Sequence, residues 1–598
     1  MNQKEKLSAL RQQMKNQGID GFFVPRADEF QGEYVPHRAR RLRWISGFTG
    51  SAGSVVVLQD KASFFTDGRY TIQAREQIDK DLFEICSTSE DQLPTPTITP
   101  TKWIEKNLPK GAKFGVDPWL HTAEQVKELK WAVETAEGKL VFVKPNPLDS
   151  VWKDKPEAPM SPAVVHDLRF AGQASEQKME AITPLMQGNA DVFVLTSPDD
   201  ICWLLNVRGS DVPYNPFVLS YALFYSSGEL DWFVDSRKIT EDVINWVPNT
   251  VKIKEFEEFS SALMQLAQEK KTFWIDDKLT PVEVNNIVVK NGGAIYSAAS
   301  PIQLMKAKKN KVEIEGAVNA HIRDGAAFIR FLAMMDERKD LNEIEAENIL
   351  YRMRKDNELF KGLSFATISG ASSNGAIVHY RATEESNKPL NAGPLYLVDS
   401  GAQYQDGTTD ITRVLPTGKI TDEIKENFTR VLKGHIQLAM AKFPQGTFGS
   451  ELDKKARQFL KEAGLDYAHG TGHGVGSYLS VHEGPCTISP KSTTVPLEEG
   501  MILSNEPGYY KEGEYGIRIE NLVVVRGTSK KDEQGKKMLC FRTLTLVPIC
   551  LELIKKEMLD DEELNWLNSY HKTVRETLWP HLKSFKEIEF IKKATVKL

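Results

Sequence analysis

Residues 394–415, PLYLVDSGAQYQDGTTDITRVL, decide the fold of the C-terminal half of this chain. An apolar run ends at Asp399, and a second run, rich in β-branched residues, follows Asp410. Between the two runs, Asp406-Gly407 supplies the residue types that tight turns prefer. The segment therefore predicts a β-hairpin with one aspartate near the facing end of each strand.

The spacing of these aspartates indicates which face of the hairpin they occupy. Asp399 and Asp410 are eleven positions apart, and with an even-numbered loop this odd separation puts both side chains on one face. A loop centred between Tyr404 and Gln405 would set them directly opposite each other, although the sequence does not fix that register. Two facing carboxylates repel, so the pair needs a cation or a shared proton, unless the hairpin is an ordinary solvated turn.

A glycine-rich segment, residues 469–485 (HGTGHGVGSYLSVHEGP), carries two histidines four positions apart. That spacing would put His469 and His473 on one face of a helix, but the alternating glycines disfavour a helix by about 1 kcal/mol each. We therefore expect both side chains to project from a loop or an irregular strand, where backbone can approach a ligand closely. A phosphate-binding loop is the alternative, but the segment has neither G-K-[ST] nor a G-x-G-x-x-G that opens a helix.

Two further runs, residues 500–510 (GMILSNEPGYY) and 515–525 (YGIRIENLVVV), predict two strands joined by a polar loop. Glu506 ends the first strand, and Glu520 lies inside the second. Period-two alternation puts Arg518 and Glu520 on the face opposite the neighbouring isoleucines. A carboxylate in so apolar a strand is rarely buried without a partner, and a structural Arg–Glu pair on a solvated face is the alternative to a bound cation.

Histidines gather in the same part of the chain, because five of the eleven fall between His379 and His482. Carboxylates together with an imidazole form a ligand set that suits Mn²⁺, Co²⁺ or Zn²⁺. Four carboxylates are more than one divalent ion usually recruits. Two ions that share bridging carboxylates would offset the repulsion and activate a water molecule between them. The combined pattern therefore predicts a site for two metal ions.

The N-terminal half contains two similar stretches. The order GFFVPRAD, LRWISGF, SFFTDGRY recurs as VFVLTSPDD, ICWLLNV, LDWFVDSRK, and each copy reads as strand-like runs alternating with turns. The matched residues are Trp44 with Trp203, Asp67 with Asp235 and Arg69 with Arg237. This self-similarity predicts a duplicated small α/β domain, with chance recurrence of strand-forming residues as the alternative.

The length of 598 residues is too great for one hydrophobic core and predicts several domains. Residues 144–162 contain five prolines and predict an extended linker. A second joint is expected near residues 300–310, because apolar residues then recur at helical spacing from Val318 to Leu332. The domains expected on these grounds are residues 1–155, 156–304 and 305–598.

Composition argues against several functional classes. The net charge of −6 and the lack of a Lys/Arg stripe argue against a nucleic-acid partner. No apolar run approaches the roughly 18 residues of a membrane helix, and the charged N-terminal stretch does not read as a signal peptide. The five cysteines are odd in number and far apart, which favours reduced thiols and a soluble cytoplasmic protein.

The candidate ligands and the motifs around them resemble the pita-bread metallopeptidases, the family of creatinase, prolidase and methionine aminopeptidase. Within this family the chain is similar to the aminopeptidase P (Xaa-Pro aminopeptidase) group in its long three-domain form. The motifs of the catalytic half are AIVHYRAT, HGTGHGVG, SNEPGYY and GIRIEN. TDGRY and SGFTGSAG resemble the creatinase-like N-terminal domain, and WLNSYHKTVRETLWPHL resembles the C-terminal extension of the long form. The resemblance implies an α/β (α+β) fold with two creatinase-like N-terminal α/β domains followed by a pita-bread catalytic domain.

The resemblance also implies roles for individual residues. Asp399 would bind one ion, His473 and Glu506 the other, and Asp410 and Glu520 both. The residues expected at the substrate are His379, His469, His482, Tyr510 and Arg518. Of the residues named, His379, His482 and Glu506 are expected to take part in catalysis.

The implied activity is hydrolysis of the N-terminal Xaa-Pro bond by a hydroxide that two divalent ions activate. Mn²⁺ is the first choice of ion, with Co²⁺ or Zn²⁺ as alternatives. The expected partners are peptides with proline at the second position and, in a homodimer, a second copy of the chain. The alternatives are a prolidase restricted to Xaa-Pro dipeptides, a methionine aminopeptidase, and a catalytically silent pita-bread module that binds peptides.

Overall fold

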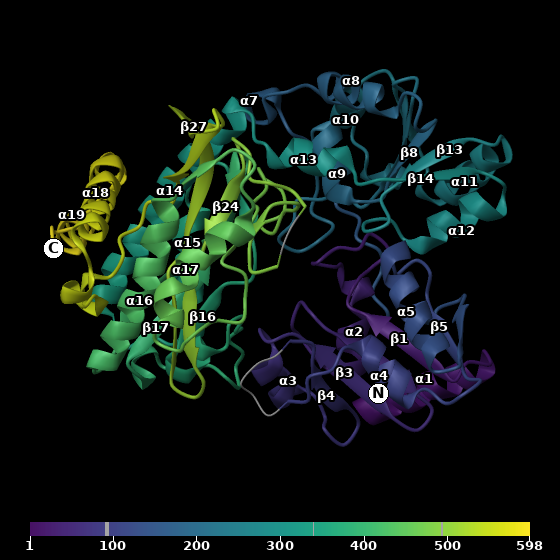
Figure 1. The fold of residues 1–598 in the computed structure, drawn as a ribbon, viewed down its shortest axis with the longest axis horizontal. Helices are drawn as coiled ribbons and strands as arrows, with labels where there is room; N and C mark the ends of the chain where they lie inside the picture. The colour runs from purple at the N-terminus through teal and green to yellow at the C-terminus, as the bar shows by residue number, and fades with distance from the viewer. Residues whose placement is uncertain (90–94, 339, 492–493) are drawn as a thin grey trace. The chain divides into compact units, whose positions relative to one another are not determined.

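The computed structural model of this chain describes residues 1–89, 95–338, 340–491 and 494–598. The chain forms two compact units, residues 1–166 with 173–302 and residues 167–172 with 303–598 (Figure 1). Among the described residues, no helix has both the length and the apolar character that crossing a membrane requires. The domain boundaries expected from the sequence stay predictions.

Two six-stranded sheets of identical topology form the core of the first unit. The strand orders are β4-β3-β2-β1-β5-β6 and β12-β11-β10-β8-β13-β14. In each sheet the second strand along the chain (β2 or β10) is antiparallel to both of its neighbours, and all other pairs are parallel. The bounds are β1 Gly21–Pro25, β2 Ser54–Leu58, β3 Ala62–Thr66, β4 Glu84–Ser87, β5 Lys113–Val116, β6 Lys139–Phe142, β8 Val192–Leu195, β10 Tyr221–Tyr225, β11 Leu230–Phe233, β12 Val251–Lys254, β13 Thr272–Ile275 and β14 Ala294–Ser297. This matching topology confirms the predicted duplication.

Helices cover these sheets. The helices of the first sheet are α1 Gln3–Asn16, α2 Arg41–Ser46, α3 Thr71–Gln77, α4 Pro100–Asn107, α5 Ala123–Thr135 and α6 Pro147–Val151. The helices of the second are α8 Ser175–Met186, α9 Pro198–Leu205, α10 Glu241–Trp246, α11 Phe259–Gln268 and α12 Val282–Lys290. The duplication extends to side chains, since Arg69 binds Asp67 at 2.7 Å in one copy and Arg237 binds Asp235 at 2.6 Å in the other.

Two sequence predictions about this unit were wrong in detail. The LRWISGF and ICWLLNV runs are mostly helical: they lie in the short α2 and α9, which end at the left-handed residues Gly47 and Asn206. Apolar runs this short do not distinguish a helix from a strand. The start of the expected linker forms α6, which Asn146 caps and Pro147 opens. Trp152 after this helix packs on Trp44 with ring centroids 5.7 Å apart, so this part of the segment belongs to the first sheet's core.

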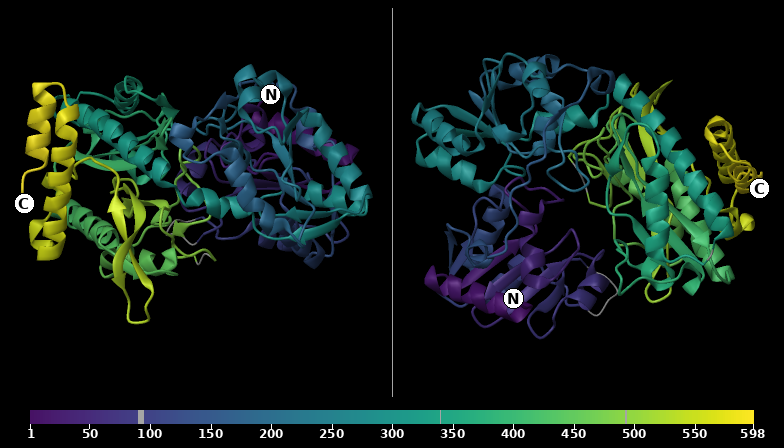
Figure 2. Two further views of the ribbon diagram at one scale, coloured as in Figure 1. Left: turned by 90° about the horizontal axis from the view of Figure 1, so that it is seen from above. Right: turned by 180° about the vertical axis from the view of Figure 1, so that it is seen from behind.

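The second unit packs long helices on curved strands. Its helices are α7 Leu168–Ala171, α14 Lys311–Glu337, α15 Glu343–Lys355, α16 Asp422–Ala439, α17 Gly449–Lys461, α18 Asp561–Leu578 and α19 Phe585–Ala594. Helix α13, Pro301–Ala307, spans the boundary between the two units. The long helix α14 confirms the helical spacing expected between Val318 and Leu332. Figure 2 shows α18 and α19 side by side as a C-terminal pair.

The strands of this unit form small sheets, ordered β15-β18-β19, β16-β17-β20, β21-β28-β27-β24, β22-β23 and β25-β26. Their bounds are β15 Phe360–Leu363, β16 Ile368–Ala371, β17 Leu395–Ser400, β18 Ala402–Tyr404, β19 Gly407–Thr408, β20 Ile411–Pro416, β21 Lys442–Pro444, β22 Gly472–His473, β23 Thr487–Ile488, β24 Ile502–Asn505, β25 Gly508–Lys511, β26 Tyr515–Arg518, β27 Asn521–Lys531 and β28 Lys537–Thr543.

The hairpin predicted over residues 394–415 is present, but its register differs from the one that would set the aspartates opposite each other. Asp399 lies opposite Thr412, so Asp410 is two residues away from the directly facing position and still on the same side. The turn is displaced because it contacts α14. Arg323 of this helix binds Asp406 in the turn. The next residue, Gly407, packs so closely on the α14 backbone that a Cβ would lie 3.1 Å from the Cα of Ala317.

Phe30 connects the two sheets of the first unit. It lies on the loop after β1 but is buried in the core of the second sheet, with its ring centroid 4.9 Å from that of Tyr221. We expect Phe30→Ala to lower the free energy of unfolding by about 3–5 kcal/mol, because the cavity left behind cannot fully close. Urea denaturation followed by tryptophan fluorescence measures the loss.

Phe142→Ala is the matched control, because Phe142 lies on β6 with 43% of its surface exposed. This change should cost less than about 1 kcal/mol. Equal losses for the two variants would contradict the role of Phe30.

Candidate metal centre

Four carboxylates lie at the ends of two strand pairs. Asp399 is on β17, and Asp410 directly precedes β20. In the second pair, Asn505, the last residue of β24, faces Asn521, the first residue of β27. Glu506 follows Asn505 and Glu520 precedes Asn521, so both glutamates lie at the same end of this strand pair. Glu520 thus lies in a short break between β26 and β27, not inside one continuous strand as the sequence predicted. The break lets the chain leave one two-stranded ribbon and enter a different sheet.

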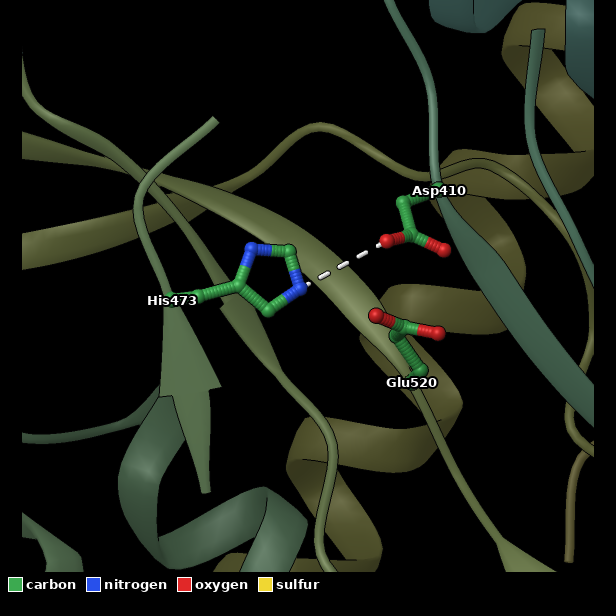
Figure 3. A group of neighbouring side chains, drawn as sticks. All are labelled: Asp410, His473 and Glu520. Carbon is green, nitrogen blue, oxygen red and sulfur yellow. Dashed lines mark ion pairs between the residues drawn. The ribbon is translucent and has the colours of Figure 1, made fainter. Parts of the chain in front are cut away.

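His473 faces three of these carboxylates from the short strand β22. Its Nε2 atom is 3.4 Å from Glu506 Oε1 and 3.6 Å from Asp410 Oδ2. Possible ligand atoms of Asp410, His473 and Glu520 all lie within 4.8 Å of one another, and Figure 3 shows the imidazole directed between the two carboxylates. The expectation that glycines keep this segment out of a helix is confirmed. A Cβ on Gly472 would lie 2.0 Å from the carbonyl oxygen of Ser504, so only glycine permits this approach.

Burial and mutual repulsion dominate the electrostatics of the group. Burial raises the pKa of Asp410 and of Glu520 well above the usual carboxyl range, and the neighbouring carboxylates raise both further. Burial raises the pKa of Glu506 to about 7, with Arg518 acting in the opposite direction and Asp399 in the same direction. The site therefore favours added positive charge, whether protons or cations.

Arg518 links the group to two further residues that the sequence singled out. Its Nη2 donates to Asp399 Oδ2 at 2.6 Å, and its Nη1 donates to the Tyr510 hydroxyl at 2.7 Å. The Tyr510 hydroxyl lies 2.8 Å from His469 Nε2, while His469 Nδ1 lies 2.8 Å from the carbonyl oxygen of Gly470. A carbonyl can only accept, so Nδ1 carries the proton of the neutral ring and Nε2 accepts from Tyr510. Arg518, Tyr510 and His469 thus form one chain that ends at Asp399.

The remaining two predicted histidines lie in different settings. His482 contacts the group, because its ring centroid is 4.3 Å from that of His473 and its charge lowers the pKa of Asp410 and of Glu506. His379 lies on the segment after the short helix η4 (Ser372–Ala376), which packs on β26. Its neighbour Tyr380 donates to Glu343 at 2.8 Å and anchors this segment. The part that His379 takes at a substrate stays a prediction.

The residues present fit a divalent cation. Asp399 Oδ1 and Asp410 Oδ1 are buried and have no hydrogen-bond partner within the described parts of the chain. A buried carboxylate oxygen without a partner is costly unless a cation binds it. Carboxylate oxygens and a neutral imidazole are suitable ligands for Mn²⁺, Co²⁺ and Zn²⁺.

Two hydroxyls that sequence reasoning missed fix the glutamates. Thr412 donates to Glu520 Oε2 at 2.7 Å, and Ser504 donates to Glu506 Oε1 at 3.0 Å while it accepts from the backbone N–H of His473 at 3.0 Å. The sequence spacing could have identified both hydroxyl residues. Thr412 is two residues after Asp410 and Ser504 two before Glu506, the spacing that puts side chains of a strand on one face.

Arg413 anchors the same strand ends to the C-terminal helices and was also missed. Its buried guanidinium donates to the carbonyl oxygens of Thr412 at 2.9 Å and Glu520 at 2.6 Å. It also donates to the Asn521 side chain at 2.7 Å and to the hydroxyl of Tyr570, on α18, at 3.0 Å. No local pattern predicts these contacts, because Tyr570 is 157 residues away along the chain.

Family models match most of the chain. Residues 315–527 match metallopeptidase family M24, and residues 537–598 match the C-terminal region of that peptidase. Residues 6–146 and 154–313 each match the creatinase/prolidase N-terminal domain.

Individual relatives match over nearly their whole length. Aminopeptidase P1 of Lotus japonicus is 37% identical, with 98% of this chain and 99% of the relative covered. A probable Xaa-Pro aminopeptidase P of Paracoccidioides brasiliensis is 39% identical, with 96% and 95% covered. Among solved structures, an X-prolyl aminopeptidase from Caenorhabditis elegans, described as a cytosolic enzyme with a di-nuclear active site, superposes with a TM-score of 0.94 at 33% identity and covers 100% of both chains.

The raised pKa of Glu506 predicts how the stability of the metal-free protein depends on pH. Because the folded value is about 7 and the ordinary value 4.5, folding favours the protonated carboxyl. Its stabilising contribution is present below the ordinary value and is lost as pH rises through the folded value, at a cost on the order of 3 kcal/mol. Asp410 and Glu520 shift in the same direction. We expect the melting temperature of chelator-treated protein to fall between about pH 4.5 and about pH 7.

Differential scanning calorimetry with and without added Mn²⁺ measures this effect. Mn²⁺ should reduce the fall, and Glu506→Gln should reduce it without any metal. A melting temperature that rises over this window in the metal-free protein would contradict the assignment.

Proposed function

The chain belongs to metallopeptidase family M24, and from this membership we propose that it is a metalloaminopeptidase that hydrolyses the N-terminal Xaa-Pro bond of peptides. One observation carries the proposal: four carboxylates and His473 converge at the ends of two strand pairs, and two buried aspartate oxygens there have no hydrogen-bond partner in the part of the chain that the structure describes. Such a group supports metal-assisted hydrolysis better than a structural role, because an ordinary core would not retain so much uncompensated negative charge.

Two divalent ions fit this ligand set. We assign Asp399 to one ion, His473 and Glu506 to the other, and Asp410 and Glu520 to both. Mn²⁺ is the proposed ion, since oxygen ligands dominate and one imidazole completes the set. When bound, ions of this kind lower the pKa of a coordinated water and polarise the scissile carbonyl.

Proline in the second position removes the amide N–H that many peptidases bind, so the enzyme must hold its substrate by other groups. We propose that His482, whose ring lies next to that of His473, donates to the carbonyl oxygen of the scissile bond. His379 is proposed for the same region of the substrate. Each such transition-state donor is typically worth about 3–4 kcal/mol.

Glu506 is the proposed proton carrier. Ser504 donates to its Oε1, and a carboxylate in this position could take a proton from water and deliver it to the departing proline nitrogen. The chain from Asp399 through Arg518 and Tyr510 to His469 would orient the proline side of the substrate.

We also propose that the enzyme acts in the cytoplasm as a homodimer. The unpaired cysteines and the likeness to an enzyme described as cytosolic support the compartment. The dimer rests on the family resemblance, and light scattering of the purified protein at micromolar concentration tests it directly.

Substrate length and metal restoration test the proposed activity together. Protein stripped with a chelator should lose turnover, because bound ions would activate the attacking water. Mn²⁺ should restore turnover better than Co²⁺ or Zn²⁺, because oxygen ligands dominate the proposed set. Restored enzyme should release free arginine from Arg-Pro-Pro faster than from Arg-Pro, as mass spectrometry of the products can show.

Two outcomes would redirect the proposal. Cleavage of Arg-Pro alone would identify a prolidase. Full metal binding without cleavage of any Xaa-Pro peptide would leave a silent binding module.

Loss of one substrate histidine should slow the reaction without emptying the metal site. We expect His482→Ala and His379→Ala each to lower kcat/KM by a factor on the order of 10², because each removes one transition-state contact. Steady-state kinetics at saturating Mn²⁺ measure the loss, and calorimetric titration shows whether the metal still binds.

The exposed His581 gives a matched control, and His581→Ala should leave kcat/KM unchanged. A loss smaller than about threefold in either test variant would assign that histidine a structural part only.

A further inference from the structure

The backbone of Thr412 lies between Asp399 on one side and Glu520 on the other. Thr412 lies on β20, fully buried, directly opposite Asp399 of the neighbouring strand. Its carbonyl oxygen accepts a hydrogen bond from the backbone N–H of Glu520 at 3.3 Å. The main chain of this one residue therefore joins the strand pair of Asp399 and Asp410 to the start of β27.

The Thr412 side chain makes a second link between the same groups. Its hydroxyl accepts from Arg518 Nε at 3.1 Å and donates to Glu520 Oε2 at 2.7 Å. The direction of both bonds is fixed, because a guanidinium can only donate and the hydroxyl has one proton to give. Glu520 Oε2 must therefore act as an acceptor, which fixes the orientation of the carboxylate, while its remaining lone pairs stay available for cations.

Arg518, at one end of this link, has two further partners. Arg518 also binds Asp399 and Tyr510, and Tyr510 continues to His469. Thr412 thus closes a bonded path from His469 to Glu520. Charge-assisted bonds in series in a buried site polarise one another and hold their members in one geometry.

We propose that Thr412 is a positioning residue of the metal centre: its hydroxyl fixes the Glu520 carboxylate for metal binding and orients Arg518 toward Asp399. This inference rests on the proposed function, because it assigns Glu520 as a ligand. Removal of a group that hydrogen-bonds to a metal ligand and orients it typically lowers metal affinity by 10- to 100-fold.

Thr429 provides a matched control on α16. It is equally buried, and its hydroxyl likewise has one acceptor and one donor partner, the carbonyl oxygen of Lys425 at 2.6 Å and the backbone N–H of Lys555 at 2.9 Å. These partners are not among the proposed ligands. A merely structural loss of a buried hydroxyl should therefore give similar results in both threonine variants.

The experiment is calorimetric titration of Mn²⁺ into the full-length, chelator-stripped protein. Thr412→Val, which keeps the shape but not the hydroxyl, should weaken Mn²⁺ binding about tenfold or more. Thr412→Ser should restore the wild-type affinity, and Thr429→Val should retain it. The melting temperature of each metal-free variant is measured alongside, so that a general loss of stability is separated from a loss of metal affinity.

The outcomes separate this inference from the proposed function. Equal Mn²⁺ affinity in Thr412→Val and wild type overturns the inference alone, as does an equal loss in Thr429→Val. Failure of the wild-type protein to bind Mn²⁺ overturns the proposed function and this inference with it. If Thr412→Val does not fold, Thr412→Ala gives the same test, since it lacks the hydroxyl without placing a methyl group against Glu520.

Discussion

Repulsion among four carboxylates at one buried site is the constraint on which the rest of the catalytic unit depends. Each would be unfavourable in a protein interior without compensation. One guanidinium, that of Arg518, binds Asp399 directly, and a single positive charge cannot balance four negative ones. Asp399 Oδ1 and Asp410 Oδ1, which have no hydrogen-bond partner among the described residues, mark where further positive charge belongs. The arrangement is thus costly as a plain protein core and favourable as a cage for divalent ions.

Holding such a group in place requires a rigid frame behind it. Arg413 satisfies its donors on carbonyl oxygens and side chains of the strands that carry Asp410 and Glu520. On the far side, Tyr570 of α18 accepts from Arg413 and stacks on Trp566 with ring centroids 5.2 Å apart. Fully satisfied buried networks of this kind favour one unique geometry. The C-terminal helices therefore form part of the support of the carboxylate group.

Much of this arrangement could be predicted from local patterns. The odd separation of Asp399 and Asp410 placed them on one face for every register with an even-numbered loop, because side chains alternate along a strand. The glycines around His473 excluded a helix for reasons of backbone energy alone. The repeat of the N-terminal motifs predicted two copies of one sheet, and the two sheets share the same strand order. The nature of the carboxylates and the imidazole indicated a divalent metal before any geometry was known.

Contacts between distant residues decided the rest. Asp399 faces Thr412, since α14 holds the turn at Asp406, and no residue near the hairpin encodes that contact. LRWISGF became a helix and α6 joined the first core, because apolar runs this short take the form that buries them best. Sequence alone determined which chemical groups this protein brings to its site and on which faces they lie, since backbone periodicity and residue chemistry are local. Only the tertiary structure decided which atoms meet, because the register, the Thr412–Glu520 bond and the Arg413–Tyr570 bond depend on contacts between residues 83 to 157 positions apart along the chain.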